Sequence, residues 1–211
     1  MDTQTPLYGR LLVRFTKPFP NFDFSFIKRI RHRAVALLLL ESGDRVLDAG
    51  CGPGGSFPFL RDSVGSSGQV VGIEISPEHA EIAQNRIKSN NWDNVEVIVA
   101  SAQSAKLAET FNGLLMFAAP DVYGSGDAMD NLTQYLKPGS RLVAFGGRLS
   151  AHRVGRLLNP VLRLLYKLSF STTPKPTYES WNIMANYVDD LVVEDHFLGL
   201  MFLASGTLRF R

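Results

Sequence analysis

The sequence has little cysteine, little net charge and no long apolar run. Its 211 residues contain a single cysteine, Cys51, so an internal disulfide is excluded and a reducing compartment is favoured. A formal net charge of +2 gives no reason to expect a nucleic-acid partner. No stretch approaches the roughly 20 apolar residues that are needed to cross a bilayer. We therefore expect a cytoplasmic protein.

Metal ligands are scarce too. The lone cysteine and four scattered histidines do not have the spacing of a metal site, so no metal is expected. A hydrophobic content of 45% is sufficient for one well-buried domain, and the chain is too short for two large ones. We expect one domain over residues 1–211. Its parts are an N-terminal cap and helix (1–40), a cofactor-binding core (41–147), a basic amphipathic insertion (148–185) and a C-terminal hairpin (186–211).

The most informative segment is a glycine-rich loop that follows an apolar run. The run ends in Asp48, glycines follow at positions 50, 52 and 54, and a helix-compatible segment begins at Phe57. Glycine has no Cβ, so its backbone can approach a ligand closely and adopt positive φ at little cost. A strand, a glycine loop and a helix in this order place a ligand at the carboxyl edge of a parallel sheet, beside a helix N-terminus. The segment therefore predicts a nucleotide-like cofactor.

Two acids narrow the choice of cofactor. Residues 69–76 are mostly β-branched or apolar and predict the next strand, with Glu74 near its end. A dinucleotide fold needs a carboxylate for the ribose hydroxyls about 20 residues past its glycines, so a nicotinamide-dependent reductase using Gly50, Gly52 and Gly55 is one alternative. Asp48 favours a different cofactor. A carboxylate at the tip of the first strand would repel a pyrophosphate but would suit a ligand with an ammonium and a sulfonium group.

At these residues the chain resembles the class I S-adenosylmethionine-dependent methyltransferases. Their first motif is commonly written V-L-D-x-G-C-G-x-G, and here it stands from Val46 to Gly54. The resemblance implies that S-adenosylmethionine is the cofactor, that Asp48 and the glycine loop hold its methionine part, and that Glu74 holds its ribose hydroxyls. The cofactor-binding residues expected on this basis are Asp48, Gly50, Cys51, Gly52, Gly54, Glu74, Ile75, Ser101, Ala102, Phe117 and Tyr8.

Two positions depart from the family pattern. Ser101 stands where family members usually carry an Asp that accepts a hydrogen bond from the adenine amino group, and a hydroxyl accepts less strongly than a carboxylate. Asn112 replaces the acid of a segment often written F-D-x-V. These departures motivate a second alternative, in which the chain is a catalytically inactive S-adenosylmethionine-binding partner subunit.

The alternation of strand and helix patterns predicts an α/β fold. We expect a doubly wound, mostly parallel seven-stranded sheet with helices on both faces, closed by the antiparallel C-terminal edge hairpin that the family implies. Strands are expected at 45–49, 69–76, 94–102, 114–118, 141–145, 191–197 and 200–205. Helices are expected at 25–40, 77–88, 103–110 and 127–136, with a turn at 136–140.

The insertion is basic and amphipathic. No acid occurs between Asn131 and Tyr178, and residues 151–168 separate into a leucine-rich side and a basic side on a helical wheel. Proline cannot sit in the middle of a helix without loss, so we expect a break at Asn159, which caps a second helix with Pro160 at its first position. Three interpretations stay open: a helix that covers the sheet, a lid over the acceptor pocket, or an interfacial helix that makes a peripheral contact with an anionic membrane.

The expected reaction makes modest chemical demands. Methyl transfer from a sulfonium is an in-line displacement with a neutral leaving group, so the protein mostly supplies proximity, alignment and water exclusion. A general base is needed only where the acceptor loses a proton. The catalytic candidates follow strands four and five and are Asp121, Tyr123 and His152. We expect a methyltransferase that acts on a small apolar or amphipathic acceptor (a metabolite, or a quinone-like or lipid-like molecule), with phenylalanines between positions 15 and 26 as candidates for its pocket. The sequence leaves the oligomeric state open.

Overall fold

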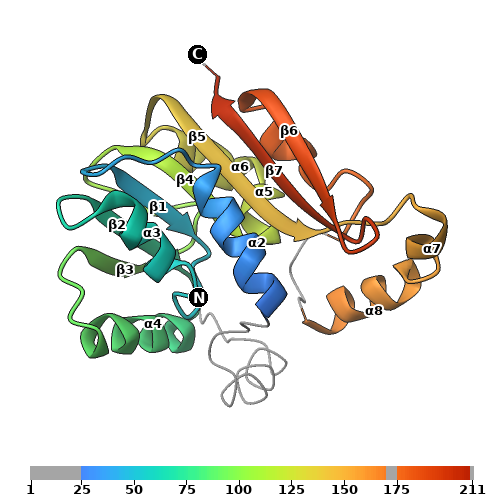
Figure 1. Ribbon diagram of the computed structural model, residues 1–211, viewed down its shortest axis with the longest axis horizontal. Helices are drawn as coiled ribbons and strands as arrows, with labels where there is room; N and C mark the ends of the chain where they lie inside the picture. The colour runs from blue at the N-terminus through green and yellow to red at the C-terminus, as the bar shows by residue number, and fades with distance from the viewer. Residues whose placement is uncertain (1–24, 170–174, 210–211) are drawn as a thin grey trace.

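The computed structural model describes residues 25–169 and 175–209. Seven strands form one sheet in the order β3-β2-β1-β4-β5-β7-β6, in which β7 is antiparallel to both of its neighbours and the pairs from β3 to β5 are parallel (Figure 1). The expected α/β fold with its C-terminal hairpin is confirmed. The strands are β1 Arg45–Ala49, β2 Gln69–Glu74, β3 Val95–Val99, β4 Phe111–Phe117, β5 Leu136–Gly147, β6 Val188–His196 and β7 Met201–Leu208.

Helices cover both faces of the sheet. The helices of the described residues are α2 Ser25–Ala36, α3 Phe57–Val64, α4 Pro77–Ser89, α5 Pro120–Tyr123, α6 Gly126–Thr133, α7 Arg153–Arg156, α8 Asn159–Ser169 and α9 Asn182–Ala185. The alternation of side chains along β1 divides the core. Val46 belongs to the apolar cluster with α2, α3 and α4, whereas Leu47 belongs to the cluster with α5, α6 and α9. Asp48 follows in the same alternation and therefore lies on the side of α2 and α3.

Some expected element bounds are wrong. Residues 103–110 form turns and irregular backbone rather than a helix. Two backbone carbonyls of this region, Ala102 O and Ala105 O, accept hydrogen bonds from the Asn131 side chain at 2.9 Å each. Strand β5 begins at Leu136 and includes the residues of the expected turn. The pairing of β5 with β4 is irregular there, and Gly139 has φ +80°. Helix α2 ends at Ala36 rather than at residue 40, and Leu39 follows it at φ +52°.

The insertion after β5 contains two helices. The expected break is present, because α7 ends at Arg156 and α8 begins at Asn159. The Asn159 side chain is used elsewhere: Oδ1 accepts from Ser150 N at 2.8 Å, and Nδ2 donates to Ser150 O at 3.1 Å. These two bonds fix the start of α8 to the segment that leaves β5. Within residues 25–169 and 175–209, no helix has the length and apolar character to cross a membrane.

Candidate functional site

The glycine loop lies at the carboxyl edge of the sheet, between β1 and α3. Gly50 N and Cys51 N both donate to Ile73 O, at 2.8 and 3.0 Å, which ties the loop to the end of β2. Gly50 has φ +74°, and a Cβ there would come 2.6 Å from Ala119 Cβ, just after β4. The loop therefore requires glycine at position 50 for both its conformation and its close packing.

Gly52 faces open space. It has φ +54°, and a Cβ built on it would meet no atom of the described residues within 4 Å. Its amide donates to Glu74 Oε2 at 2.8 Å, while Glu74 Oε1 accepts from Ser76 N at 2.8 Å. Glu74 is buried, so burial raises its pKa, and the two amides and the nearby His79 oppose that rise. The loop and the acid at the end of β2 thus form one hydrogen-bonded unit beneath an open space.

Asp48 is the most unusual group at this edge. Its side chain is 1% exposed, and neither carboxylate oxygen has a hydrogen-bond partner among the described residues. Burial raises the Asp48 pKa to about 7, against the opposing effects of the Arg31 charge and of Ser56. A buried carboxylate without donors is costly. A positive charge or N–H donors brought close to Asp48 would therefore stabilise its ionised form.

Arg31 also belongs to the site, although its sequence position did not suggest it. Its Nη1 donates to Ser56 Oγ at 2.9 Å, and its guanidinium carbon lies 4.1 Å from the centre of the Phe117 ring. Arg31 therefore lies on the packed side of α2, and it is 8% exposed. The available signal was the spacing, because Arg31 lies one turn from both Ile27 and Val35, which are buried.

The remaining cofactor candidates reach the same edge from four strands. Ile75, after β2, is 60% exposed and borders the open side. Ser101 follows β3, and its hydroxyl contacts the Gln103 side chain. Phe117 ends β4 and stacks on Phe145 with ring centres 4.4 Å apart. Burial raises the pKa of the Cys51 thiol well above its ordinary value, which keeps it protonated and suits a packing role.

Ala102 follows Ser101 and is buried. Tyr8 and the phenylalanines at positions 15, 19, 22 and 24 lie outside the described residues.

The family follows from a comparison with known protein families. A model of the methyltransferase domain matches residues 40–163, which is more than half of the chain. This chain belongs to the S-adenosylmethionine-dependent methyltransferases. The matched range contains the glycine loop, Asp48, Glu74 and the strand ends described above. The cofactor of this family is S-adenosylmethionine.

Curated methyltransferases resemble the chain over part of their length. Protein-L-isoaspartate O-methyltransferase 2 of Archaeoglobus fulgidus is 38% identical over 109 residues, which are 51% of this chain and 47% of the relative. Demethylmenaquinone methyltransferase of Bacillus pumilus is 25% identical over 138 residues (61% and 59%). Aklanonic acid methyltransferase of a Streptomyces species is 29% identical over 150 residues (71% and 60%). The chain spans about half to three-fifths of the length of these relatives.

Solved structures of methyltransferases share the fold. A S-adenosylmethionine-dependent methyltransferase from Aquifex aeolicus superposes with a TM-score of 0.63 at 18% identity, covering 88% of this chain and 98% of that one. Geranyl diphosphate C-methyltransferase from Streptomyces coelicolor, solved with Mg2+, geranyl diphosphate and S-adenosyl-L-homocysteine, has a TM-score of 0.70 at 16% identity, covering 86% and 79%.

The three catalytic candidates of the methyltransferase occupy different surroundings. Asp121 lies in α5 at the rim, its pKa is raised by partial burial, and its charge raises the pKa of Glu74. Tyr123 is 2% exposed and packs edge-on against Phe202. His152 lies apart from them at the start of α7, with Nε2 3.4 Å from Asp195 Oδ2.

A cavity of about 200 Å³ opens at the carboxyl ends of β4 and β5. Its mostly apolar wall comes from α5, from Gly147 at the end of β5, and from residues 175–183. Pro120 and Tyr123 contribute from α5, and Pro120 follows Ala119, the residue that packs against Gly50 of the glycine loop. The cavity therefore adjoins the cofactor edge of the methyltransferase.

Proposed function

We propose that this chain transfers the methyl group of S-adenosylmethionine to a small apolar or amphipathic acceptor. The observation that carries the proposal is the apolar cavity beside the glycine loop, which shares α5 with the cofactor edge. A cavity of about 200 Å³ suits a ring-sized group rather than a folded macromolecule. The acceptor would enter at the ends of β4 and β5 and meet the cofactor near Ala119.

The residues at the edge fit the cofactor. S-adenosylmethionine, when bound, supplies an electrophilic methyl group on a sulfonium. Asp48 would balance its positive charge and accept its N–H groups, since both carboxylate oxygens lack other donors in the described structure. Gly52 leaves space above the loop, and Glu74 keeps lone pairs for ribose hydroxyls while holding the loop through Gly52 N.

The acceptor side would work mainly by positioning. The apolar part of the wall, formed by Pro120, Tyr123 and Ile183, would limit access of water to the acceptor, which favours methyl transfer over loss to solvent. For an acceptor that loses a proton, Asp121 is the candidate general base: it lies in α5 between Pro120 and Tyr123, which line the cavity, and desolvation raises its pKa. Tyr123 would line the cavity and orient the acceptor through its ring.

The names of two of the three curated relatives, and of one structural neighbour, support a small organic acceptor. Two relatives are named for demethylmenaquinone and aklanonic acid, and a structural neighbour for geranyl diphosphate. Asn112, one of the two departures that favoured an inactive subunit, lies at the opposite edge of the sheet. There its Oδ1 accepts from Arg45 N at 3.1 Å and from Lys137 Nζ at 3.0 Å. It therefore bears on strand registration and not on the cofactor.

The test uses S-adenosylmethionine carrying a labelled methyl group. The purified chain is incubated with a panel containing hydroxylated quinones, phenols and prenyl compounds, with isoaspartyl peptides and transfer RNA as macromolecular acceptors. We expect label in an organic-extractable small molecule. Label that enters only peptide or RNA would overturn the proposed acceptor class, and cofactor binding without transfer to any acceptor would favour the inactive subunit.

A cavity variant separates acceptor binding from cofactor binding. Thr177→Trp places a large ring in the cavity wall and should lower turnover more than about tenfold with unchanged cofactor affinity. Thr110→Trp is the matched control, because Thr110 is exposed before β4 and does not line the cavity. Equal turnover in both variants would place the acceptor elsewhere.

A further inference from the structure

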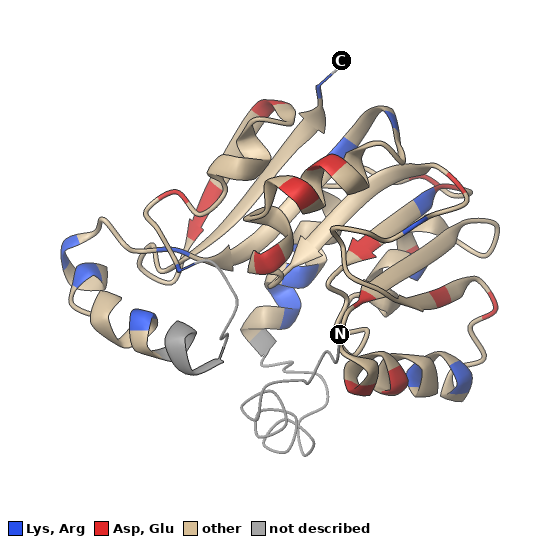
Figure 2. Cartoon of the chain, turned by 180° about the vertical axis from the view of Figure 1, so that it is seen from behind, with Lys and Arg blue, Asp and Glu red and all other residues tan. Residues whose placement is uncertain are grey.

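Helices α7 and α8 project from the side of the molecule (Figures 1 and 2). Their base is firmly held. A Cβ at Gly155 would come 2.2 Å from Ser150 Oγ and 2.3 Å from Leu198 O, so α7 packs closely against the turn between β6 and β7. Asn159 adds the two hydrogen bonds to Ser150 described above. The base of the projection is therefore fixed to the segment after β5 and to the β6–β7 turn.

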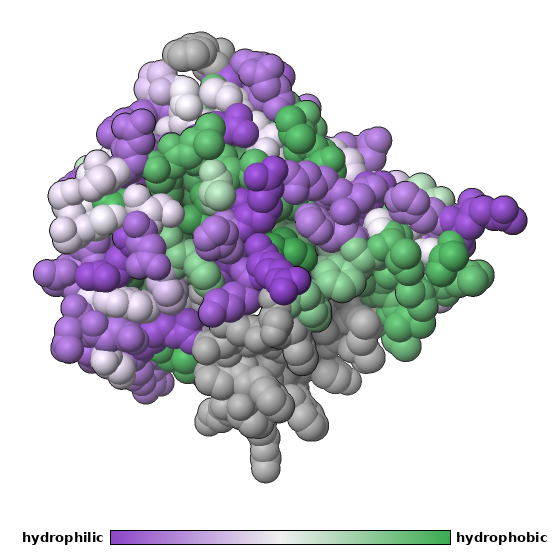
Figure 3. Space-filling view, in the orientation of Figure 1, coloured by the Kyte–Doolittle hydropathy of each residue, from purple (hydrophilic) through white to green (hydrophobic). Residues whose placement is uncertain are grey.

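The outer surface of the projection is apolar. Five of the thirteen large apolar side chains that are exposed in the described structure lie within eleven residues here. We call this surface the α7–α8 apolar face, and it consists of Val154, Leu157, Leu158, Val161 and Leu164, which are 43–78% exposed. Figure 3 shows it as a hydrophobic area at the projecting edge. The interpretation that this segment covers the sheet is wrong, because these side chains face solvent.

The turn between β6 and β7 extends the apolar face. Phe197 and Leu198 are 44% and 57% exposed, and the Phe197 ring lies 4.6 Å from that of Phe26 on α2. Both turn residues have positive φ, +50° and +55°, a conformation that is costly for bulky side chains. Exposed apolar residues held in a strained conformation are typical of a contact surface.

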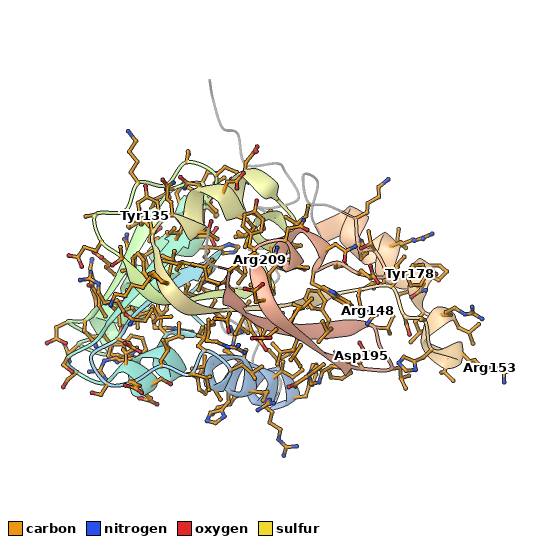
Figure 4. The ribbon with its side chains drawn as sticks, turned by 90° about the horizontal axis from the view of Figure 1, so that it is seen from above. Tyr135, Arg148, Arg153, Tyr178, Asp195 and Arg209 are labelled. Carbon is orange, nitrogen blue, oxygen red and sulfur yellow. The ribbon has the colours of Figure 1, made fainter. Side chains whose placement is uncertain are left out.

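The charged residues of α7 and α8 themselves are all basic. Arg153, Arg156 and Arg163 are exposed, and within the described part of the chain no ion pair joins them to an acid. Figure 2 shows basic but no acidic residues along α7 and α8. Figure 4 shows Arg153 at the outer end of the molecule, apart from the Arg148–Asp195 pair. A second copy of this chain would bring the same cations together across a symmetric contact, which disfavours self-association.

We propose that the α7–α8 apolar face docks on a membrane interface that contains anionic lipid. The exposed leucines and valines enter the boundary between headgroups and acyl chains, and Arg153, Arg156 and Arg163 contact lipid phosphates. An amphipathic helix with leucine on one side and arginine on the other has the composition that this mode of binding requires. The proposal does not depend on the proposed acceptor, because lipid binding is measured without cofactor.

The test is sedimentation of the purified chain with vesicles of phosphatidylcholine, with or without phosphatidylglycerol. We expect the chain to pellet with anionic vesicles at low salt and to be released at high salt, because screening weakens the arginine contacts. Leu157→Glu combined with Leu164→Glu should lower the partition coefficient more than about tenfold. Replacing Arg153, Arg156 and Arg163 together by glutamine should remove the preference for phosphatidylglycerol.

Leu39→Glu is the matched control. Leu39 is 70% exposed and follows α2 at the opposite edge of the sheet, so this variant should bind vesicles like the wild type. Thermal melts establish that each variant is folded. Failure of the wild type to bind anionic vesicles, or unchanged binding by the double glutamate variant, would overturn the proposal. A wild-type dimer that the double variant dissociates, with no vesicle binding, would instead identify the surface as a self-association contact.

Discussion

Replacing Asp48 by asparagine separates the stability of this protein from its affinity for a cationic ligand. The substitution keeps the shape of the side chain and removes its negative charge. Asp48 is 1% exposed, and its carboxylate oxygens have no hydrogen-bond partner among the described residues. The ionised form is therefore unfavourable in the free protein, and we expect Asp48→Asn to raise the free energy of unfolding at neutral pH and above.

The magnitude follows from the pKa. Burial raises the Asp48 pKa from 3.8 to about 7 in the folded state. A raised acid pKa stabilises the folded state below the unfolded pKa, and this contribution is lost as the pH rises through the folded pKa. The cost of ionisation at about pH 8 is then about 4 kcal/mol, and at about pH 5 it is about 2 kcal/mol. The stability gained by Asp48→Asn should therefore grow by about 2–3 kcal/mol between these conditions.

The assay is urea denaturation of both proteins at several pH values between about pH 5 and about pH 8. Asp62→Asn is the control, because Asp62 is exposed on α3. The same Asp48→Asn protein should bind S-adenosylmethionine more weakly at every pH, as measured by calorimetric titration. A stability difference that does not change with pH would refute the reasoning, because Asp48 would then titrate alike in the folded and unfolded states.

Three further predictions concern the cofactor edge. Glu74→Gln should weaken cofactor binding by about 1–3 kcal/mol in a calorimetric titration, since it leaves donors poorly matched, and unchanged affinity would remove Glu74 from the site. Gly52→Val should weaken binding more than Glu74→Gln, because it fills the open space above the loop and resists φ +54°; equal affinities in a side-by-side titration would contradict this. Wild-type affinity for S-adenosylmethionine should rise as the pH increases toward and through about 7, and Arg31→Met should move this rise to higher pH, because the Arg31 charge lowers the Asp48 pKa; coincident pH profiles would exclude that role.

The sequence alone determined the fold and the place of the glycine loop at the carboxyl edge of the sheet. Alternating strand and helix patterns imply a parallel sheet, and the carboxyl ends of parallel strands meet at one edge. The positions of Asp48, Gly52 and Glu74 at that edge follow from local chain order, because each lies at or just after the end of a strand. Backbone geometry confirms this at the glycines, where positive φ and close packing leave little freedom.

Only the tertiary structure decided which amphipathic surfaces are covered. A helical wheel separates apolar from basic residues, but it does not say whether another element packs on the apolar side. In α2 the apolar side is buried against the sheet and α3. Arg31 is buried with it, because Ser56 and the Phe117 ring give its guanidinium polar and aromatic partners. In α7 and α8 the same pattern faces solvent, because Gly155 and Asn159 anchor these helices beside the sheet rather than over it. The difference comes from contacts between residues far apart in the chain, which local periodicity does not encode.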